Sequence, residues 1–188
     1  SVKSIVVVDM PFGTYENGKK TALKNARKIL DLTGAHAVKL EGGESISKTI
    51  KYLTSNKINV MGHLGMLPQK MNGRYRVYGK KDSEKKKLKK DFKFLEDAGV
   101  FSIVIECTLK SLVDEILQKK KVPTIGIGAS DNCDGQILVT DDLIGMTDFE
   151  SKFLKKYSRI NNSIEVSIKK FCNDVKNKRY PKSNYLYK

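Results

Sequence analysis

Ala37-Val38-Lys39-Leu40-Glu41 is a short apolar run that ends in a carboxylate, and it sets the pattern for the whole chain. Further runs of the same design recur along the sequence, each bounded by turn residues. They are Ile5-Val6-Val7-Val8-Asp9, Val60-Met61-Gly62-His63-Leu64, Ser102-Ile103-Val104-Ile105-Glu106, Thr124-Ile125-Gly126-Ile127-Gly128 and Gln136-Ile137-Leu138-Val139-Thr140. Short runs rich in β-branched residues predict buried β-strands.

Amphipathic segments separate most of these runs. The segment from Lys19 to Thr33 places its apolar residues on one helical face, and Gly34 is the expected C-terminal cap. The tail at 180–188 shows no period. Other helical stripes are Ile46, Ile50 and Leu53; Leu88, Phe92 and Leu95; Leu109, Leu112, Val113 and Ile116, stopped by Pro123; and Ile164, Ile168, Phe171 and Val175.

Alternating strands and helices predict a parallel α/β protein. Two architectures fit this alternation, a doubly wound sheet and a (β/α)8 barrel. Several of the strands end in a polar residue or a glycine, and this favours the barrel. Barrel enzymes collect their chemistry at the carboxyl ends of many strands, whereas a doubly wound sheet concentrates it near one switch point. We expect a single barrel domain over residues 1–188, with about six of eight strand–helix units present.

The composition argues against several classes of protein. Hydrophobic residues make up 39% of the 188, enough for a packed core, and no stretch approaches the roughly 20 apolar residues that span a membrane. The 3 cysteines are far apart and form no CxxC pair, so neither a disulfide scaffold nor a structural zinc site is expected. The net charge of +15 could indicate nucleic-acid binding, but charge alone gives only non-specific affinity. We therefore interpret the excess of lysine as solvated helix faces.

Charged residues at strand ends are the candidates for chemistry. Lys39 and Glu41 are two apart on one strand, so their side chains point to the same face, and Asp9 and Glu106 end other strands. A carboxylate is costly to bury unless it is paired or binds a metal. Carboxylates without cysteine ligands suit Mg²⁺. For any one of them, a strand end that simply reaches solvent is the alternative.

Five segments in order along the chain resemble motifs of the ketopantoate hydroxymethyltransferase family. Together they cover nearly the whole sequence, which is far more specific than a single short motif. They are residues 7–15 (VVDMPFGTY), 34–43 (GAHAVKLEGG), 60–69 (VMGHLGMLPQ), 98–107 (AGVFSIVIEC) and 125–136 (IGIGASDNCDGQ).

The resemblance implies a (β/α)8 barrel of the phosphoenolpyruvate/pyruvate superfamily type. It also implies transfer of a hydroxymethyl group from 5,10-methylenetetrahydrofolate to 3-methyl-2-oxobutanoate, giving 2-dehydropantoate for pantothenate and coenzyme A biosynthesis. The reaction would pass through an enolate stabilised by Mg²⁺. The family is a homo-oligomer, usually a decamer, and acts on small molecules. We expect no specific nucleic acid and no membrane partner, and a cytoplasmic location, or a mitochondrial one in a eukaryote.

The resemblance also implies roles for individual residues. Asp9 and Glu41 match the family's metal-site acids, and Asp9 also lies where the substrate binds. Lys39 matches the lysine that contacts the oxo acid, and Glu106 matches the proton acceptor. His63 matches a histidine of the substrate-binding region, with a hydrogen-bonded structural histidine as the alternative.

The sequence departs from the family pattern before residues 7–15. The family's first two strand–helix units have no counterpart here, and they normally supply an aspartate metal ligand with an adjacent serine. We therefore expect the sequence to be N-terminally incomplete, which leaves the activity of the 188 residues alone as an open question. Ser130 also stands where many relatives have glycine.

Two other functions remain open at this point. A related Mg²⁺-dependent barrel enzyme, of the phosphoenolpyruvate mutase and isocitrate lyase type, would form an enolate from another 2-oxo acid. The absence of a KKCGH-like loop argues against the lyase branch. An inactive, truncated chain would instead serve as a basic binding module, with a nucleic-acid affinity that falls steeply with salt.

Overall fold

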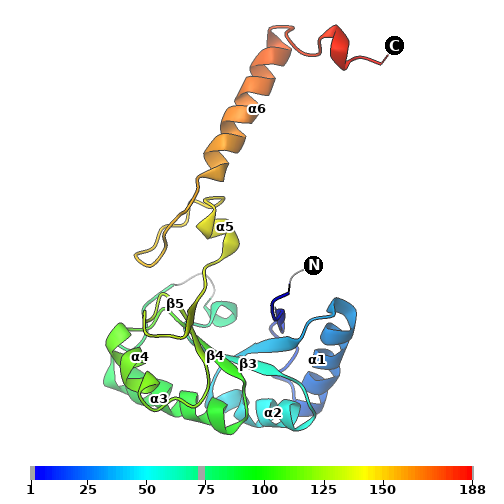
Figure 1. Cartoon of the computed structure of the whole chain (residues 1–188). Coiled ribbons are helices and arrows are strands. Elements are labelled where there is room, and N and C mark those ends of the chain that lie inside the picture. Colours follow the sequence, from blue (N-terminus) through cyan, green and yellow to red (C-terminus); the bar gives the residue numbers. More distant parts are fainter. Residues whose placement is uncertain (1–2, 72–74, 188) are drawn as a thin grey trace. The chain divides into compact units, whose positions relative to one another are not determined.

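A single parallel sheet forms the centre of the fold. The computed structural model describes residues 3–71 and 75–187, and the chain divides into two compact units, Ser1–Ile137 and Leu138–Lys188. The first unit holds the 6-stranded sheet, whose strands are all parallel (Figure 1). They are β1 Val7–Asp9, β2 Ala37–Glu41, β3 Val60–Gly65, β4 Ser102–Glu106, β5 Thr124–Ile127 and β6 Gly135–Gln136.

The strands lie in the sheet in the order in which they occur in the sequence, β1-β2-β3-β4-β5-β6. A doubly wound sheet is thereby excluded, because its strand order reverses at a switch point. Right-handed crossovers that all advance in one direction bring every connecting helix to the same face. These helices are α1 Lys19–Thr33, α2 Glu44–Ser55, α3 Asp82–Asp97 and α4 Lys110–Leu117, with a 3-10 turn, η1 Pro68–Lys70, before α3.

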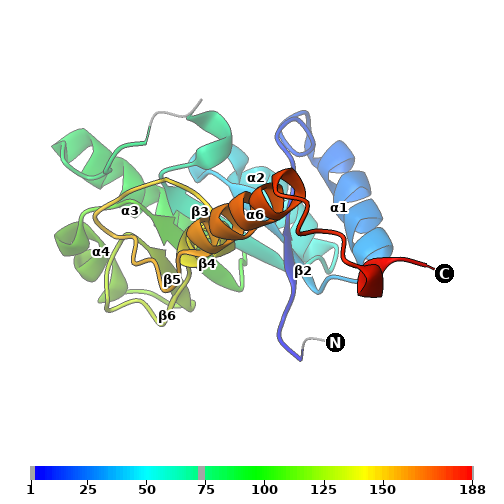
Figure 2. The same cartoon turned by 90° about the horizontal axis from the view of Figure 1, so that it is seen from above.

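Figures 1 and 2 show α1 to α4 following one another along the outside of a curled sheet. Adjacent helices of this series contact one another. The arrangement is that of part of a (β/α)8 barrel, which confirms the fold class that the sequence predicts.

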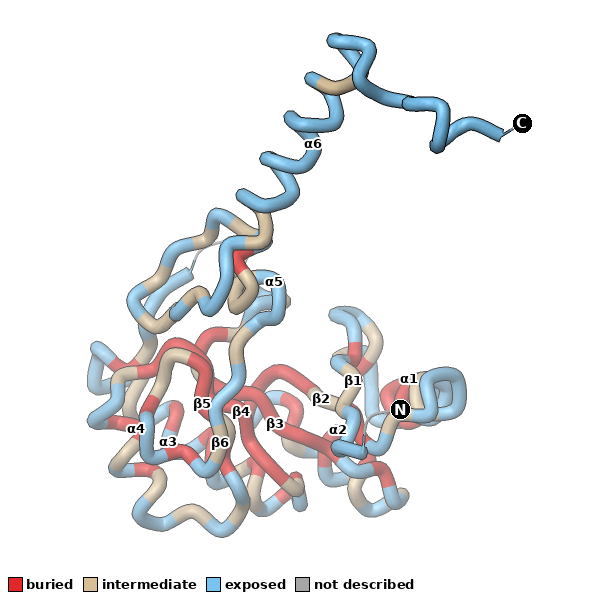
Figure 3. Tube along the Cα trace, turned by 45° about the horizontal axis from the view of Figure 1, so that its top comes forward, coloured by how far each residue is buried: buried red, intermediate tan, exposed pale blue. Residues whose placement is uncertain are grey.

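The hydrophobic core lies between the sheet and these helices. In β2, Val38 and Leu40 are fully buried, while Lys39 and Glu41 alternate onto the opposite face. We call that opposite face the inner face of the sheet. Figure 3 shows the buried segments running through β2 to β5. The helices contribute the residues that the sequence stripes predict, among them Ala22, Ala26, Ile46, Ile50, Leu53, Leu88, Phe92, Leu95, Leu112, Val113 and Ile116.

The sixth predicted strand, at residues 136–140, is wrong over most of its length. Pairing with β5 ends at Gln136, and Thr140 already begins the short helix α5 Thr140–Leu143. Ile137 and Val139 are 44% and 55% exposed. Their β-branched side chains favour a strand, but both side chains are exposed, so burial does not hold this stretch in the sheet.

The second unit contains α5, a long helix α6 Ile160–Lys176 and a 3-10 turn, η2 Ser183–Tyr185. The predicted stripe of α6 is present, and its residues are exposed: Ile164, Ile168, Phe171 and Val175. Phe171, Tyr180 and Tyr185 form a series of ring contacts, with centroids 5.6 and 5.5 Å apart. No helix within residues 3–71 and 75–187 has the length and apolar character needed to cross a membrane.

Candidate active site

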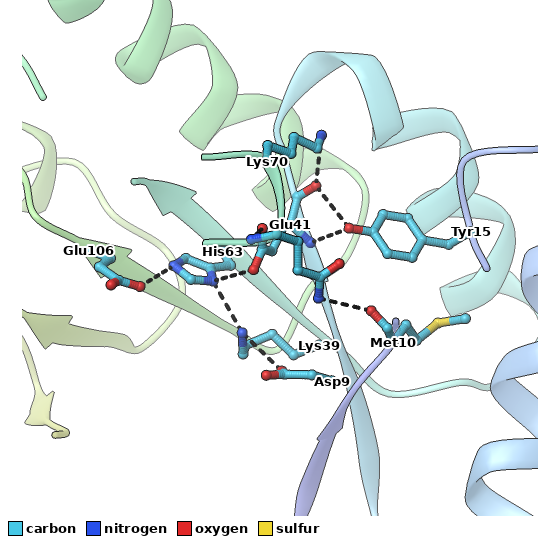
Figure 4. Close-up of polar contacts among 9 residues, drawn as sticks. Asp9, Met10, Tyr15, Lys39, Glu41, His63, Lys70 and Glu106 are labelled. Carbon is cyan, nitrogen blue, oxygen red and sulfur yellow. Dashed lines mark hydrogen bonds and ion pairs between the residues drawn. The ribbon is translucent and has the colours of Figure 1, made fainter. Parts of the chain in front are cut away.

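The register of the strands brings the predicted site residues together. Asp9 of β1 is paired with Lys39 of β2, and Glu41 of β2 with His63 of β3. One row further along, Gly65 of β3 is opposite Glu106 of β4. Since side chains alternate along a strand, Lys39, Glu41, His63 and Glu106 all belong to the inner face (Figure 4). The site therefore forms at the carboxyl ends of four adjacent strands, as expected for a barrel enzyme.

A line of polar contacts crosses these strands. Lys39 Nζ lies 2.9 Å from Asp9 Oδ1 and 3.1 Å from His63 Nδ1. His63 Nε2 lies 3.0 Å from Glu106 Oε2, at an angle outside that of a hydrogen bond. Each contact joins neighbouring strands, in the order Asp9, Lys39, His63, Glu106. The four residues therefore form one connected group across β1 to β4.

The ammonium group of Lys39 determines the tautomer of His63. A lysine ammonium only donates hydrogen bonds, so Nδ1 of His63 must be the acceptor in their contact. The neutral ring then carries its hydrogen on Nε2, the nitrogen that faces the Glu106 carboxylate. His63 is only 2% exposed, which shields this arrangement from bulk water.

Glu41 is a buried carboxylate with few polar contacts. Its Oε1 is 3.8 Å from His63 Nδ1, and its Oε2 accepts a hydrogen bond from the backbone N–H of Gln69 at 3.2 Å. Burial raises the pKa of Glu41, and the nearby charge of Asp9 raises it further, whereas His63, Gln69 and Lys39 lower it. The ionised form is therefore costly here and would be stabilised by a cation.

Two residues that hold Glu41 were not predicted from the sequence, although both lie in the quoted motifs. Tyr15 is fully buried; its hydroxyl accepts from the Glu41 N–H at 3.3 Å and lies 3.5 Å from the Glu41 carbonyl. Burial raises the pKa of Tyr15 to about 12. Gln69 donates its side-chain amide to the Met10 carbonyl at 3.1 Å, in addition to its backbone bond to Glu41. In sequence they are an ordinary aromatic and an ordinary amide, so only their contacts in the fold reveal the role.

The donor set suits Mg²⁺ better than any softer metal. Asp9 and Glu41 supply carboxylate oxygens, and Mg²⁺ is commonly held by one or two carboxylates together with substrate oxygens and water. The buried carboxylate of Glu41, whose pKa is raised by burial, fits such a cation. Within residues 3–71 and 75–187, no three His, Cys, Asp or Glu side chains are grouped so as to hold a metal by themselves. A site of this kind would thus depend on ligands beyond Asp9 and Glu41.

Cys107 follows Glu106 but takes no part in this site. It is buried, and burial raises the pKa of its thiol to about 11. The thiol is thus protonated at neutral pH and is a poor nucleophile. A buried and protonated thiol of this kind packs as a small hydrophobic side chain.

A curled parallel sheet with acids, a lysine and a histidine at its strand ends defines an enzyme of the (β/α) barrel class. The sequence model of the family described as ketopantoate hydroxymethyltransferase matches residues 1–183. The chain belongs to the ketopantoate hydroxymethyltransferase family.

Curated relatives agree with this assignment, and each is named 3-methyl-2-oxobutanoate hydroxymethyltransferase. The protein of Pelagibacter ubique (strain HTCC1062) is 51% identical over 185 residues, covering 98% of this chain and 71% of the relative. That of Rhizobium etli is 42% identical, covering 99% of this chain and 69% of the relative. That of Bartonella bacilliformis is 41% identical, covering 100% and 70%.

Proposed function

We propose that this protein transfers a hydroxymethyl group from 5,10-methylenetetrahydrofolate to 3-methyl-2-oxobutanoate, giving 2-dehydropantoate. The observation that carries the proposal is the connected group Asp9–Lys39–His63–Glu106 beside the buried Glu41, on one face of a partial barrel. The relatives' shared name supplies the oxo acid, and the family description supplies the reaction class.

Asp9 and Glu41 are the proposed Mg²⁺ ligands. When bound, Mg²⁺ supplies Lewis acidity that makes the hydrogen on C3 of the oxo acid more acidic and favours the enolate. The carboxylate and keto oxygens of the oxo acid are ligands of the type that this ion prefers. Lys39, which is paired with Asp9, offsets the negative charge of the oxo acid in a site that excludes much of the water.

Glu106 is the proposed base that removes the C3 proton. His63 Nε2 lies 3.0 Å from the Glu106 carboxylate, and His63 is the proposed residue that positions this carboxylate before the proton is taken. After removal of the proton, C3 forms a bond to the methylene carbon of the folate donor. Both C–N bonds to that carbon break, and water supplies the hydroxyl group. The C3 proton and the second proton of water complete the two N–H groups of tetrahydrofolate.

Exchange of the C3 hydrogen with solvent tests this mechanism, because exchange needs no folate. We expect Mg²⁺-dependent exchange with 3-methyl-2-oxobutanoate, followed by NMR in D₂O. Glu106→Gln should reduce the rate at least 100-fold while binding of the oxo acid is largely kept. The surface variant Glu115→Gln, on α4, is the matched control and should exchange like the unmodified protein. Equal loss of exchange and binding in Glu106→Gln would mean that Glu106 is only structural.

Substrate choice is tested by the same assay. Faster exchange with a different 2-oxo acid would favour a related Mg²⁺-dependent enolate-forming enzyme. Retention of nucleic acid in place of any oxo acid would favour a basic binding module, with a steep salt dependence. Because the relatives are bacterial proteins, we propose a cytoplasmic location. We also propose a homo-oligomer of the family's usual size, a decamer. Sedimentation velocity measures the oligomeric state directly.

A further inference from the structure

Gln69, in the turn η1, is hydrogen-bonded to both strands that carry the proposed Mg²⁺ ligands. Its side-chain amide donates to the Met10 carbonyl at 3.1 Å, and its backbone N–H donates to Oε2 of Glu41 at 3.2 Å. Met10 directly follows Asp9 at the end of β1, and Glu41 is the last residue of β2 (Figure 4). One residue thus joins the ends of these two strands.

The position of Asp9 depends on the residue that follows it. The side chain of Asp9 is 57% exposed and is paired with Lys39, and β1 itself is only 3 residues long. Met10, by contrast, is fully buried, and its N–H donates to the Lys39 carbonyl at 3.0 Å. Its carbonyl accepts from Gln69. These two hydrogen bonds of Met10 therefore help to hold Asp9 in place relative to β2.

The turn η1 is a firm support for both contacts of Gln69. Pro68 begins the turn with a φ that its ring restricts, and the Lys70 N–H donates to the Leu67 carbonyl at 2.9 Å. The Gln69 N–H lies between these residues in the chain and donates to Glu41. A backbone donor and a side-chain donor on one such residue keep the two strand ends at a constant separation.

We propose that Gln69 is a positioning residue that sets the spacing of the Asp9 and Glu41 carboxylates and thereby the affinity of the site for Mg²⁺. The inference rests on the proposed function. Mg²⁺ requires nearly octahedral geometry and short metal–oxygen distances, so a small shift of one carboxylate relative to the other weakens binding. Replacing a group that orients metal ligands typically lowers metal affinity about 10–100-fold.

Gln69→Met tests the proposal, because it keeps the length of the side chain and removes the donor to Met10. Within residues 3–71 and 75–187, Oε1 of Gln69 is buried without a hydrogen-bond partner, so its removal leaves no donor unpaired. Mn²⁺ takes the same oxygen ligands as Mg²⁺, and electron paramagnetic resonance measures its free concentration. In the presence of 3-methyl-2-oxobutanoate, we expect the Kd for Mn²⁺ to rise about tenfold in Gln69→Met.

Gln118→Met is the matched control, at an exposed glutamine that ends α4, and it should bind Mn²⁺ as the unmodified protein does. Amide hydrogen exchange measured by NMR without metal tests the contact itself. The N–H of residue 69 should exchange about tenfold faster in Gln69→Met, because the turn is no longer tied to Met10 and opens more readily.

The Mg²⁺ dependence of C3 exchange supplies a further measurement. In Gln69→Met the Mg²⁺ concentration that gives half the maximal rate should rise about tenfold. The rate at saturating Mg²⁺ should be largely restored, because Gln69 acts on metal binding and Glu106 removes the proton. A low rate that excess Mg²⁺ does not restore would contradict the proposed role.

The outcomes separate this inference from the function on which it rests. The same Kd for Mn²⁺ in Gln69→Met and Gln118→Met would overturn the positioning role and leave the proposed reaction standing. Lower thermal stability of Gln69→Met with an unchanged Kd would also overturn it, because Gln69 would then be only structural. Absence of Mn²⁺ binding in the unmodified protein would overturn the metal site of Asp9 and Glu41, and the inference with it.

Discussion

Tyr15 shows how one buried hydroxyl supports the site. It is the acceptor for the backbone N–H of Glu41, and it is fully buried, so water has no access to replace it. Tyr15→Phe should lower the free energy of unfolding by about 1–3 kcal/mol, because the N–H of Glu41 loses its partner. Urea denaturation followed by circular dichroism measures the change.

Tyr52 provides the comparison for that experiment. It is partly buried on α2, with Lys19 over its ring at 5.0 Å, so its phenyl body does the packing. Tyr52→Phe keeps that ring and should unfold at nearly the urea midpoint of the unmodified protein. Identical midpoints for the two variants would show that the Tyr15 hydroxyl contributes nothing to stability.

Asp134 is the residue for which a pH dependence is expected. Its carboxylate pairs with Lys120 and accepts hydrogen bonds from the Thr124 N–H at 2.7 Å and hydroxyl at 3.0 Å, tying the start of β5 to the chain before β6. These contacts hold the pKa of Asp134 well below the ordinary range of an aspartate, with the hydrogen bond from Lys120 as the largest cause. A lowered pKa in the folded state stabilises the fold above the unfolded value and ceases to do so as the pH falls through the folded value.

Asp134→Asn should therefore unfold at lower urea than the unmodified protein at pH 7, and the difference should shrink below about pH 4. Asp97→Asn, at an exposed position ending α3, serves as the control and should show no such trend. A difference that is independent of pH would contradict an electrostatic role for Asp134.

At the scale of elements, β3 and β4 can approach only because Gly65 has no side chain. A Cβ at Gly65 would lie 2.1 Å from the backbone oxygen of Glu106, and the backbone φ is +89°. Gly65→Ala should destabilise the fold by about 2 kcal/mol or more, through this backbone clash and the unfavourable φ. Gly135→Ala places its Cβ at an ordinary 3.9 Å from Ile125 and should be close to neutral in the same thermal melts. Equal melting temperatures for the two would refute the close approach.

Element boundaries were predictable wherever burial and periodicity agreed. The strands at Ala37–Glu41 and Ser102–Glu106 and the helix at Lys19–Thr33 have the bounds that their patterns predict. The strand predicted at 136–140 is wrong over most of its length, because β-branched residues that are exposed gain too little from burial to stay in the sheet. The local sequence pattern thus locates a strand or helix, while burial in the folded protein decides whether a short strand forms.

Among the site residues too, some are visible in the local sequence pattern and others only in the folded structure. Asp9, Lys39, Glu41, His63 and Glu106 were predicted because polar residues at the ends of apolar strands are conspicuous in sequence. Their meeting followed from the parallel register. Tyr15 and Gln69 were missed because their hydrogen bonds to Glu41 span 26 and 28 positions and leave no periodic trace.

At the scale of the whole molecule, the packed interior belongs to the first unit. Every residue of the hydrophobic core cluster lies between Met10 and Cys133, within Ser1–Ile137. In the second unit the large apolar side chains of α6, such as Ile168 and Phe171, are exposed instead. The sheet, the helices that cover it and the proposed site should thus be stable without Leu138–Lys188.

A chain ending at Ile137 should therefore keep the near-ultraviolet circular dichroism of the full chain and unfold within about 0.5 kcal/mol of it in urea, as expected when the whole hydrophobic core cluster is kept. Leu95→Ala, which empties a fully buried position, should cost about 2–5 kcal/mol in either length of chain. That variant shows that the assay can detect loss of core packing. If truncation instead abolishes the unfolding transition while Leu95→Ala in the full chain does not, the second unit would have to supply stability that the core of the first lacks.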